Sequence, residues 1–176
     1  LYIPDCVRAK DGKLYVPVRV LAKCFGADVT WSGATQTVTV GRMTTALASA
    51  ESYYNATDLY WLSRIISAES ESEPLRGKIA VGNVVLNRVA SDEFPNTIHG
   101  VIFDTNYGVQ FTPVANGTVY NEPDWESVLA AKLVLDGAKL VPGDCLYFLE
   151  VAAATNLWTV NNRDYVATIG SHSFYL

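Results

Sequence analysis

The sequence predicts an α+β fold, in which helices surround a small antiparallel sheet, preceded by a short βαββ unit. Several segments in the middle of the chain have an apolar residue at every third or fourth position, a pattern typical of amphipathic helices. Near both ends, short alternating runs are separated by glycine-containing turns, which is typical of hairpins. The chain has 176 residues and is 49% hydrophobic, which suits one core with a small appendage.

Residues 1–42 have the pattern of a separate small unit. Units this short seldom fold alone, so we expect this one to pack on the rest of the chain, on an upstream half or on a copy of itself. Cys6 and Cys24 both lie in it, and a disulfide between them would staple the unit. The elements expected here are a strand at 14–18, a helix at 18–25 closed by Gly26, and a hairpin of 29–31 with 36–40.

Residues 43–57 are interpreted as a linker that becomes helical, and residues 58–176 as the main domain. Thr57 or Asp58 is expected to cap the helix that follows. Residues 79–89 are apolar nearly all round and predict a buried central helix, with a buried strand as the alternative because Gly82 interrupts them.

The remaining segments predict shorter elements of the main domain. Cys145 opens one of the strands and is expected to be a buried free thiol. The expected elements are a short helix entered by 94–98, an extended segment at 109–114, an amphipathic helix at 123–135, a strand at 145–149, and a hairpin of 165–169 with 173–175 around Gly170.

Charge is unevenly distributed and excludes some classes of partner. Residues 1–42 hold six Lys/Arg and three Asp/Glu, whereas residues 43–176 hold seven and fifteen. An acidic body argues against nucleic acid, which needs clustered basic residues, and suits a neutral or sugar-like ligand; solubility alone also explains it. No apolar run is long enough to span a membrane, and no CxxC or HExxH motif predicts a metal site. We expect no cofactor.

Glu69 is the residue that most strongly suggests chemistry. Leu62, Ile65 and Ile66 precede it at helical spacing, so all four lie on one face. A carboxyl group on an apolar face has a raised pKa, and a protonated Glu can act as the general acid that glycosidic bond cleavage needs. The alternative is an exposed last turn, because the polar residues 70–73 follow. Helical periodicity alone does not distinguish a buried Glu69 from an exposed one.

Several segments resemble the SleB/CwlJ-like cell-wall hydrolases, the family of spore cortex-lytic enzymes, over roughly residues 59–176. Residues 1–42 resemble the copper amine oxidase N-terminal-like repeat, which commonly decorates secreted wall proteins; they offer no copper ligand set. The segments that carry the first resemblance are IISAESESEP (65–74), GKIAVGNVVLNRV (77–89), FPNTI (94–98), VIF (101–103), QFTPV (110–114), LYF (146–148) and IGSHSFY (169–175).

The resemblance implies a lysozyme-like catalytic domain that cleaves peptidoglycan glycan strands, with Glu69 as the catalytic acid. The expected activity is that of a lytic transglycosylase, which leaves 1,6-anhydro ends on N-acetylmuramic acid. We also expect secretion to the cell wall. The sequence starts at Leu1 without a signal peptide, so any export signal is expected to lie upstream of this fragment. The alternatives are a hydrolytic muramidase that uses Glu73 or a positioned water, and a catalytically silent wall-binding protein.

The resemblance also implies that Gln110 and Thr112 bind substrate, on one face of an extended strand. Tyr107 is a candidate for stacking on a sugar ring, and His172 for bordering the cleft, although packing explains either. Glu73 is a second acid or a turn-capping residue. Two further expectations are hydrogen bonds from Asn87 and Arg88 to a neighbouring loop, and adhesion to wall polymers or self-association through residues 1–42.

Overall fold

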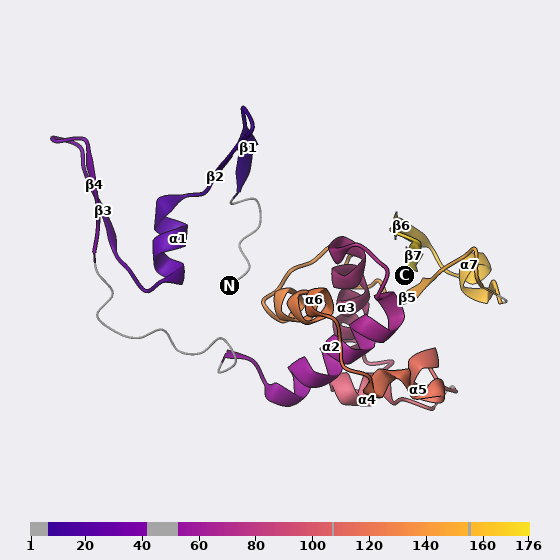
Figure 1. Cartoon of the computed structure of the whole chain (residues 1–176). Coiled ribbons are helices and arrows are strands. Elements are labelled where there is room, and N and C mark those ends of the chain that lie inside the picture. The colour runs from indigo at the N-terminus through magenta and orange to yellow at the C-terminus, as the bar shows by residue number, and fades with distance from the viewer. Residues whose placement is uncertain (1–6, 42–52, 107, 155) are drawn as a thin grey trace. The chain divides into compact units, whose positions relative to one another are not determined.

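The computed structural model describes residues 7–41, 53–106, 108–154 and 156–176. The chain divides into two compact units between Tyr53 and Tyr54. The N-terminal unit consists of one helix and two separate two-stranded antiparallel sheets (Figure 1). Its elements are β1 (Arg8–Lys10), β2 (Lys13–Tyr15), α1 (Val18–Cys24), β3 (Val29–Ser32) and β4 (Thr37–Val40).

The N-terminal unit agrees with most of its predicted elements but has almost no core. The helix and the β3–β4 hairpin are confirmed, whereas the preceding strand ends at Tyr15 because Pro17 caps the helix, and β1 was not expected. Among the described residues of this unit, Ala22 is the only buried apolar side chain. Cys24 is exposed, and Cys6 lies outside the described residues.

Three long helices form the core of the second unit: α2 (Ala56–Ser70), α3 (Leu75–Ala90) and α6 (Trp125–Leu135). They pack against one another, as Figure 1 shows. Their fully buried side chains include Leu62, Ile65, Ile66, Val81, Val84, Val85, Ala130 and Ala131. The shorter elements are α4 (Ile98–Ile102), α5 (Thr112–Asn116), a 3₁₀ turn η2 (Thr118–Tyr120) and α7 (Trp158–Asn162).

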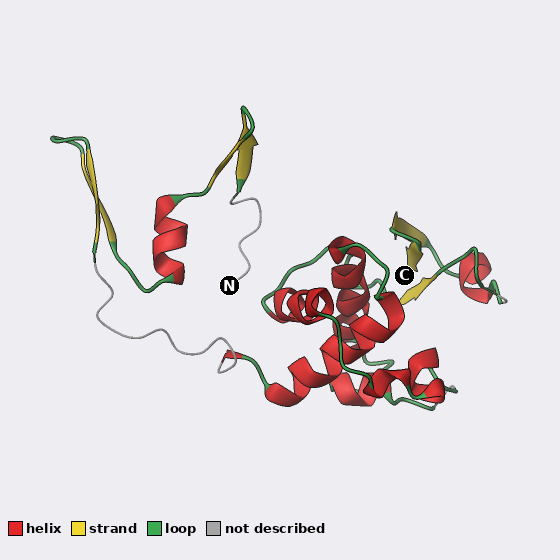
Figure 2. Ribbon diagram, in the orientation of Figure 1, coloured by secondary structure: helices red, strands yellow, loops and turns green. Residues whose placement is uncertain are grey.

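A small antiparallel sheet completes this unit. It consists of β5 (Tyr147–Leu149), β7 (His172–Tyr175) and β6 (Tyr165–Ile169), in that spatial order. Figure 2 shows these strands at one side of the helices rather than enclosed by them. Phe148 pairs with Phe174 across β5 and β7, and Gly170, with a φ of 65°, turns β6 back into β7. The predicted terminal hairpin is therefore confirmed.

The helix that carries Glu69 begins earlier than predicted. Asn55, not Thr57 or Asp58, is its N-cap, because the Asn55 Oδ1 atom accepts hydrogen bonds from the backbone N–H groups of both those residues, at 2.9 and 3.1 Å. The helix therefore starts inside the segment interpreted as a linker.

Residues 79–89 are helical, as part of α3, and the strand alternative is wrong. Gly82, which suggested a strand, instead permits close helix packing. A Cβ atom at Gly82 would lie 2.8 Å from Ile66 Cδ1 and 3.0 Å from Val134 Cγ2, so α2 and α6 both approach α3 most closely where it has no side chain.

The predicted extended segment at 109–114 is wrong, because the chain turns into α5 at Thr112. Pro113 fits the first turn of a helix, where its missing N–H group is not needed. Gly117, with a φ of 82°, ends the helix in the left-handed conformation. The alternation of apolar residues that suggested a strand arises from Phe111 and Pro113, both buried at the start of this turn.

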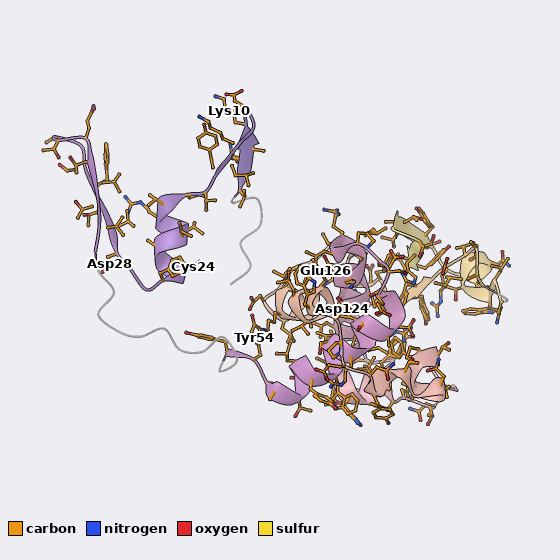
Figure 3. All side chains as sticks on the ribbon, in the orientation of Figure 1. Lys10, Cys24, Asp28, Tyr54, Asp124 and Glu126 are labelled. Carbon is orange, nitrogen blue, oxygen red and sulfur yellow. The ribbon has the colours of Figure 1, made fainter. Side chains whose placement is uncertain are left out.

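Asp124 joins the three long helices at the start of α6 (Figure 3). Its carboxylate accepts hydrogen bonds from Lys78 Nζ at 2.8 Å, from Ser67 Oγ at 3.1 Å and from the Ser127 N–H group at 3.0 Å. Burial alone would raise the pKa of Asp124, but these hydrogen bonds outweigh it and leave the pKa well below its usual range. Lys78, almost fully buried, thereby has a charged partner.

Candidate active site

Glu69 lies in the last turn of α2, on the side of the helix that carries its buried residues. Leu62, Ile65 and Ile66 are fully buried there, and Glu69 is partly buried. The helix continues to Ser70 and turns directly towards α3. The structure therefore places this carboxyl group at the edge of the core rather than on a frayed helix end.

A cleft of about 380 Å³ opens beside Glu69. It brings together Glu69, Gln110, Thr112 and His172, all of which the sequence singled out. Glu73 does not line it, and Tyr107 lies outside the described residues. The lining residues come from α2, α3, the start of α5, β5 with the loop after it, and β7: Glu69, Arg88, Gln110, Phe111, Thr112, Phe148, Leu149, Glu150, Ala153, Ala154 and His172.

The carboxyl group of Glu69 is in a state suited to proton transfer. No hydrogen bond or ion pair joins it to another residue in the part of the chain that the structure describes. Burial raises the pKa of Glu69 to about 7, and the positive charge of nearby Arg88 offsets only part of that rise. Near neutral pH the group therefore exists in both protonated and ionised forms, as an acid that later serves as a base requires.

Arg88 lines the cleft from α3 and is buried. Its Nε atom donates to the Leu146 carbonyl oxygen at 2.8 Å, and its guanidinium lies 5.2 Å from the centre of the Phe111 ring. Asn87 donates to the carbonyl oxygens of Pro142 and Cys145, at 2.7 and 2.9 Å. The predicted hydrogen bonds to a neighbouring loop are therefore confirmed for both residues.

The position of Arg88 beside Glu69 was not predicted from the sequence. Its Nη1 atom is buried and has no hydrogen-bond partner among the described residues. A signal existed, because Arg88 is the one charged residue within the mostly apolar segment 79–89, and such a charge is rarely buried without a partner or a function. Glu150, a second carboxylate of the cleft, was also missed; it lies in a loop among alanines and gave no signal.

Glu73 holds two turns together. It is buried, and its carboxylate accepts hydrogen bonds from the Ser171 N–H group at 3.1 Å and from the Ser171 hydroxyl. A Cβ atom at Gly170 would lie 1.6 Å from Glu73 Oε2, and one at Gly77 would lie 2.9 Å from it. Through these contacts, Glu73 connects the turn between α2 and α3 to the turn between β6 and β7.

His172 is buried at the side of the cleft, against the edge of Phe148, with ring centres 5.3 Å apart. Burial lowers the pKa of His172, and the charges of Glu73 and Glu150 offset part of that effect. The ring is therefore neutral at neutral pH. Its Nδ1 atom is buried and has no hydrogen-bond partner among the described residues.

Gln110 and Thr112 both reach the cleft, but not from one face of a strand. Gln110 precedes the start of α5, and its side-chain amide donates to the Gly108 carbonyl oxygen at 3.1 Å. Thr112 is exposed in the first turn of α5, and Phe111 between them is buried. Both polar side chains therefore reach the cleft from the start of a helix and not from a strand.

Neither a metal centre nor a membrane span is found in the described ranges. No three His, Cys, Asp or Glu residues there lie close enough together to hold a metal ion. None of the helices described is both long and apolar enough to cross a membrane. Cys145 is a buried free thiol, as predicted, and burial raises its pKa to about 11.

Residues 72–175, more than half of the chain, match the model of the cell wall hydrolase family. The chain belongs to this family. The match begins just after Glu69, so the family model itself does not include that residue. Residues 6–58 of this cell wall hydrolase match the copper amine oxidase N-terminal domain. Both resemblances seen in the sequence are therefore confirmed.

Relatives of this cell wall hydrolase include spore cortex-lytic enzymes. It is 37% identical over 123 residues to that of Bacillus cereus, and 33% identical over 124 residues to that of Bacillus subtilis. These stretches cover 69% of this chain, but 45% and 38% of the respective enzymes. The chain thus spans less than half the length of these relatives.

Two solved structures resemble this cell wall hydrolase. The catalytic domain of the germination-specific lytic transglycosylase SleB from Bacillus anthracis is 33% identical, with a TM-score of 0.63 over 70% of this chain and 97% of that one. The catalytic domain of the Bacillus cereus SleB protein is 35% identical, with a TM-score of 0.61 over 70% of this chain and 92% of that one. The predicted lysozyme-like α+β fold is confirmed.

Proposed function

We propose that this cell wall hydrolase cleaves the glycosidic bond after N-acetylmuramic acid in peptidoglycan, as a lytic transglycosylase. Glu69 is the single general acid and base. One observation carries the proposal: a partly buried carboxyl group without a polar partner, whose pKa burial raises to about 7, lines a cleft that is open to solvent and edged by polar side chains. The similarity to a SleB domain described as a lytic transglycosylase supports the same reaction.

The reaction needs no water. Protonated Glu69 gives its proton to the glycosidic oxygen, and the bond from that oxygen to the anomeric carbon breaks. The ionised carboxylate then accepts the proton of the sugar's own 6-hydroxyl group as its oxygen bonds to the anomeric carbon. The products are a 1,6-anhydro end and a free 4-hydroxyl group, and Glu69 is protonated again.

The other residues of the cleft hold the glycan. The Gln110 amide and the Thr112 hydroxyl suit the N-acetyl and hydroxyl groups of the sugars, and the neutral ring of His172 forms part of the cleft wall. Tyr107, three positions before Gln110 in the sequence, is retained as a candidate for stacking on a sugar ring. Glu73 contributes by fixing the hairpin that carries His172, through its hydrogen bonds to Ser171.

Hydrolysis is the second candidate, and Glu150 favours it more than Glu73 does. An inverting hydrolase needs a second carboxylate, about 6.5–9.5 Å from the acid, to activate water. Glu150 lines the same cleft as Glu69, whereas Glu73 is bound to Ser171 and does not line it. In this mechanism the product carries a reducing end instead of an anhydro end.

Replacing Glu69 by Gln tests the proposed role of this residue. Glu69→Gln keeps the shape of the side chain but cannot transfer a proton, so release of anhydro-muropeptides from purified peptidoglycan should fall at least a hundredfold. Glu71→Gln, an exposed acid at the end of the same helix, is the matched control and should retain full activity. Full activity in Glu69→Gln would contradict the proposal, and tight binding without product in the native protein would show a silent binding protein.

The N-terminal unit is proposed to attach the catalytic unit to the wall or to a second copy. Its positive charge suits anionic wall polymers, and its exposed apolar side chains, such as Leu14, Phe25 and Trp31, suit association. The site of action proposed for the whole protein is the cell wall or spore cortex, outside the cell.

A further inference from the structure

A second hollow adjoins the cleft of Glu69. Its volume is also about 380 Å³, and Gln110 lines both spaces, so the two are neighbours at that side chain. We propose that this hollow is a further sugar subsite, in which a ring of the glycan chain stacks on Trp158. The proposal rests on the proposed function, because it takes the cleft to hold a glycan. The residues that line this second hollow are Glu93, Phe94, Gln110, Tyr147, Trp158 and Arg163.

The side chain of Trp158 does not serve as a buried contact between its own helix and the rest of the unit. Trp158 begins α7, in which no residue is buried, and 53% of its surface is exposed. Because the exposed indole lines a hollow next to the cleft, its face is accessible to a ligand there. The flat apolar face of an indole fits the C–H face of a pyranose ring, whose hydroxyl groups point outward to polar partners.

Trp158 also lines a shallower space whose lining shares Leu149, Ala153 and Ala154 with the main cleft. Both spaces that contain the indole therefore border the cleft, one at Gln110 and one at the loop after β5. A chain of linked sugars that extends beyond the cleft on this side would meet the ring. This proximity favours a glycan over an unrelated ligand for the hollow.

Arg163 holds the aromatic rings of the hollow in place. Its guanidinium lies 4.4 Å from the centre of the Tyr147 ring and 5.6 Å from that of Trp158. Its Nη2 atom donates to the Tyr147 hydroxyl at 2.7 Å. A ring fixed in this way loses little freedom when a ligand binds, which is the property of a prepared site. Glu93 and Gln110 supply polar partners at the edges for sugar hydroxyl and N-acetyl groups.

The test measures binding of purified glycan strands, free of peptide, to the whole chain with Glu69→Gln in place, so that cleavage does not interfere. Adding Trp158→Ala should weaken binding roughly three- to tenfold, and adding Trp158→Phe should preserve most of it, because Phe keeps an aromatic face. A single disaccharide, which the cleft accommodates alone, should bind all these variants equally. Trp125→Ala is the matched control, since Trp125 is 72% exposed and lines neither hollow.

Three outcomes would overturn the subsite. They are unchanged strand binding in Trp158→Ala, an equal loss in Trp125→Ala, and an equal loss for the disaccharide. If Glu69→Gln abolishes cleavage while Trp158→Ala changes neither binding nor the KM of the active enzyme, the subsite is wrong and the proposed function stands. If Glu69→Gln remains active while Trp158→Ala weakens strand binding, the catalytic role is wrong and the subsite stands.

Discussion

Glu69 and Glu73 are one helical turn apart in the sequence, yet their surroundings differ. Glu69 has no polar partner among the described residues and lines an open cleft, whereas Glu73 accepts hydrogen bonds from Ser171 and is buried between two turns. Burial without a polar partner raises the pKa of Glu69, whereas the hydrogen bonds to Ser171 fix the Glu73 side chain between the two turns. At the scale of single residues, this contrast separates a proton donor from a structural anchor.

The raised pKa of Glu69 predicts how activity depends on pH. Because the protonated carboxyl is the reactive form, kcat/KM on peptidoglycan should fall about tenfold per pH unit above a pH of about 7. A pH-rate profile measured under conditions where the fold is intact tests this. Activity that stays constant up to pH 9 would contradict it, and a loss of cleavage in Glu150→Gln would instead favour hydrolysis.

Glu69 also affects stability, with a definite sign. Its pKa in the folded state lies above the value of 4.5 for an unperturbed Glu, so the fold favours the protonated form and is destabilised as pH rises through about 7. Glu69→Gln, which cannot ionise, should therefore be more stable than the native protein at pH 9 by about 1 to 3 kcal/mol, and equally stable at pH 4. Denaturant unfolding at both pH values measures this; a less stable variant at pH 9 would contradict the burial of Glu69.

At the scale of elements, the α2–α3 turn and the β6–β7 turn are fastened together by Glu73, and Gly170 makes room for it. Gly170→Ala would place a Cβ atom 1.6 Å from Glu73 Oε2 and force the carboxylate away from Ser171. The variant should lose more than about 2 kcal/mol of stability.

Gly137→Ala is the matched control for this substitution. Gly137 also has a positive φ, of 98°, but a Cβ atom there would meet nothing within 4 Å. It should cost only the backbone strain, about 1 kcal/mol. Equal losses in the two variants would show that Glu73 is not fixed as described.

Asp124 joins α6 to α2 and α3, and the effect of removing its charge should depend on pH. Asp124→Asn keeps a helix-capping side chain but leaves the buried Lys78 without its nearest charge, so stability at pH 7 should fall by about 1 to 3 kcal/mol. Because the folded-state pKa of Asp124 is depressed, its contribution is present above pH about 4 and is lost at lower pH, where variant and native protein should converge. Asp58→Asn, in the first turn of α2, should change little at either pH.

The elements that the sequence predicted well are those whose own residues carry the pattern. Residues 79–89 are apolar all round and form the buried part of α3, and alternation around Gly170 gives the β6–β7 hairpin. The start of α5 was not predictable from alternation, because Phe111 and Pro113 are buried at the start of a helix and not as alternate residues of a strand. The helix α7 buries none of its residues, so no apolar face indicated it.

The site was predictable only in part for a related reason. Glu69 is marked by its position on the apolar face of its own helix. The approach of Arg88 and Glu150 to Glu69 depends on how α3 and β5 lie against α2, and spacing along the chain does not contain this information.

At the scale of the whole molecule, the two units differ in how far they can stand alone. The second unit has a core of fully buried side chains from three helices, and Tyr54, at its first residue, donates a hydrogen bond to Asp136 at the end of α6, at 3.0 Å (Figure 3). The described part of the N-terminal unit buries only Ala22. Catalysis is therefore proposed to belong to the second unit, and attachment to the first.

The most direct measurement of the central claim is mass spectrometry of the products that the whole protein releases from peptidoglycan in water labelled with heavy oxygen. The proposed mechanism closes the sugar onto its own 6-hydroxyl group, so the muropeptides should carry 1,6-anhydro ends without label, and Glu69→Gln should release none. Reducing ends that contain the heavy oxygen would show that water, not the sugar hydroxyl, attacks, and would contradict the account.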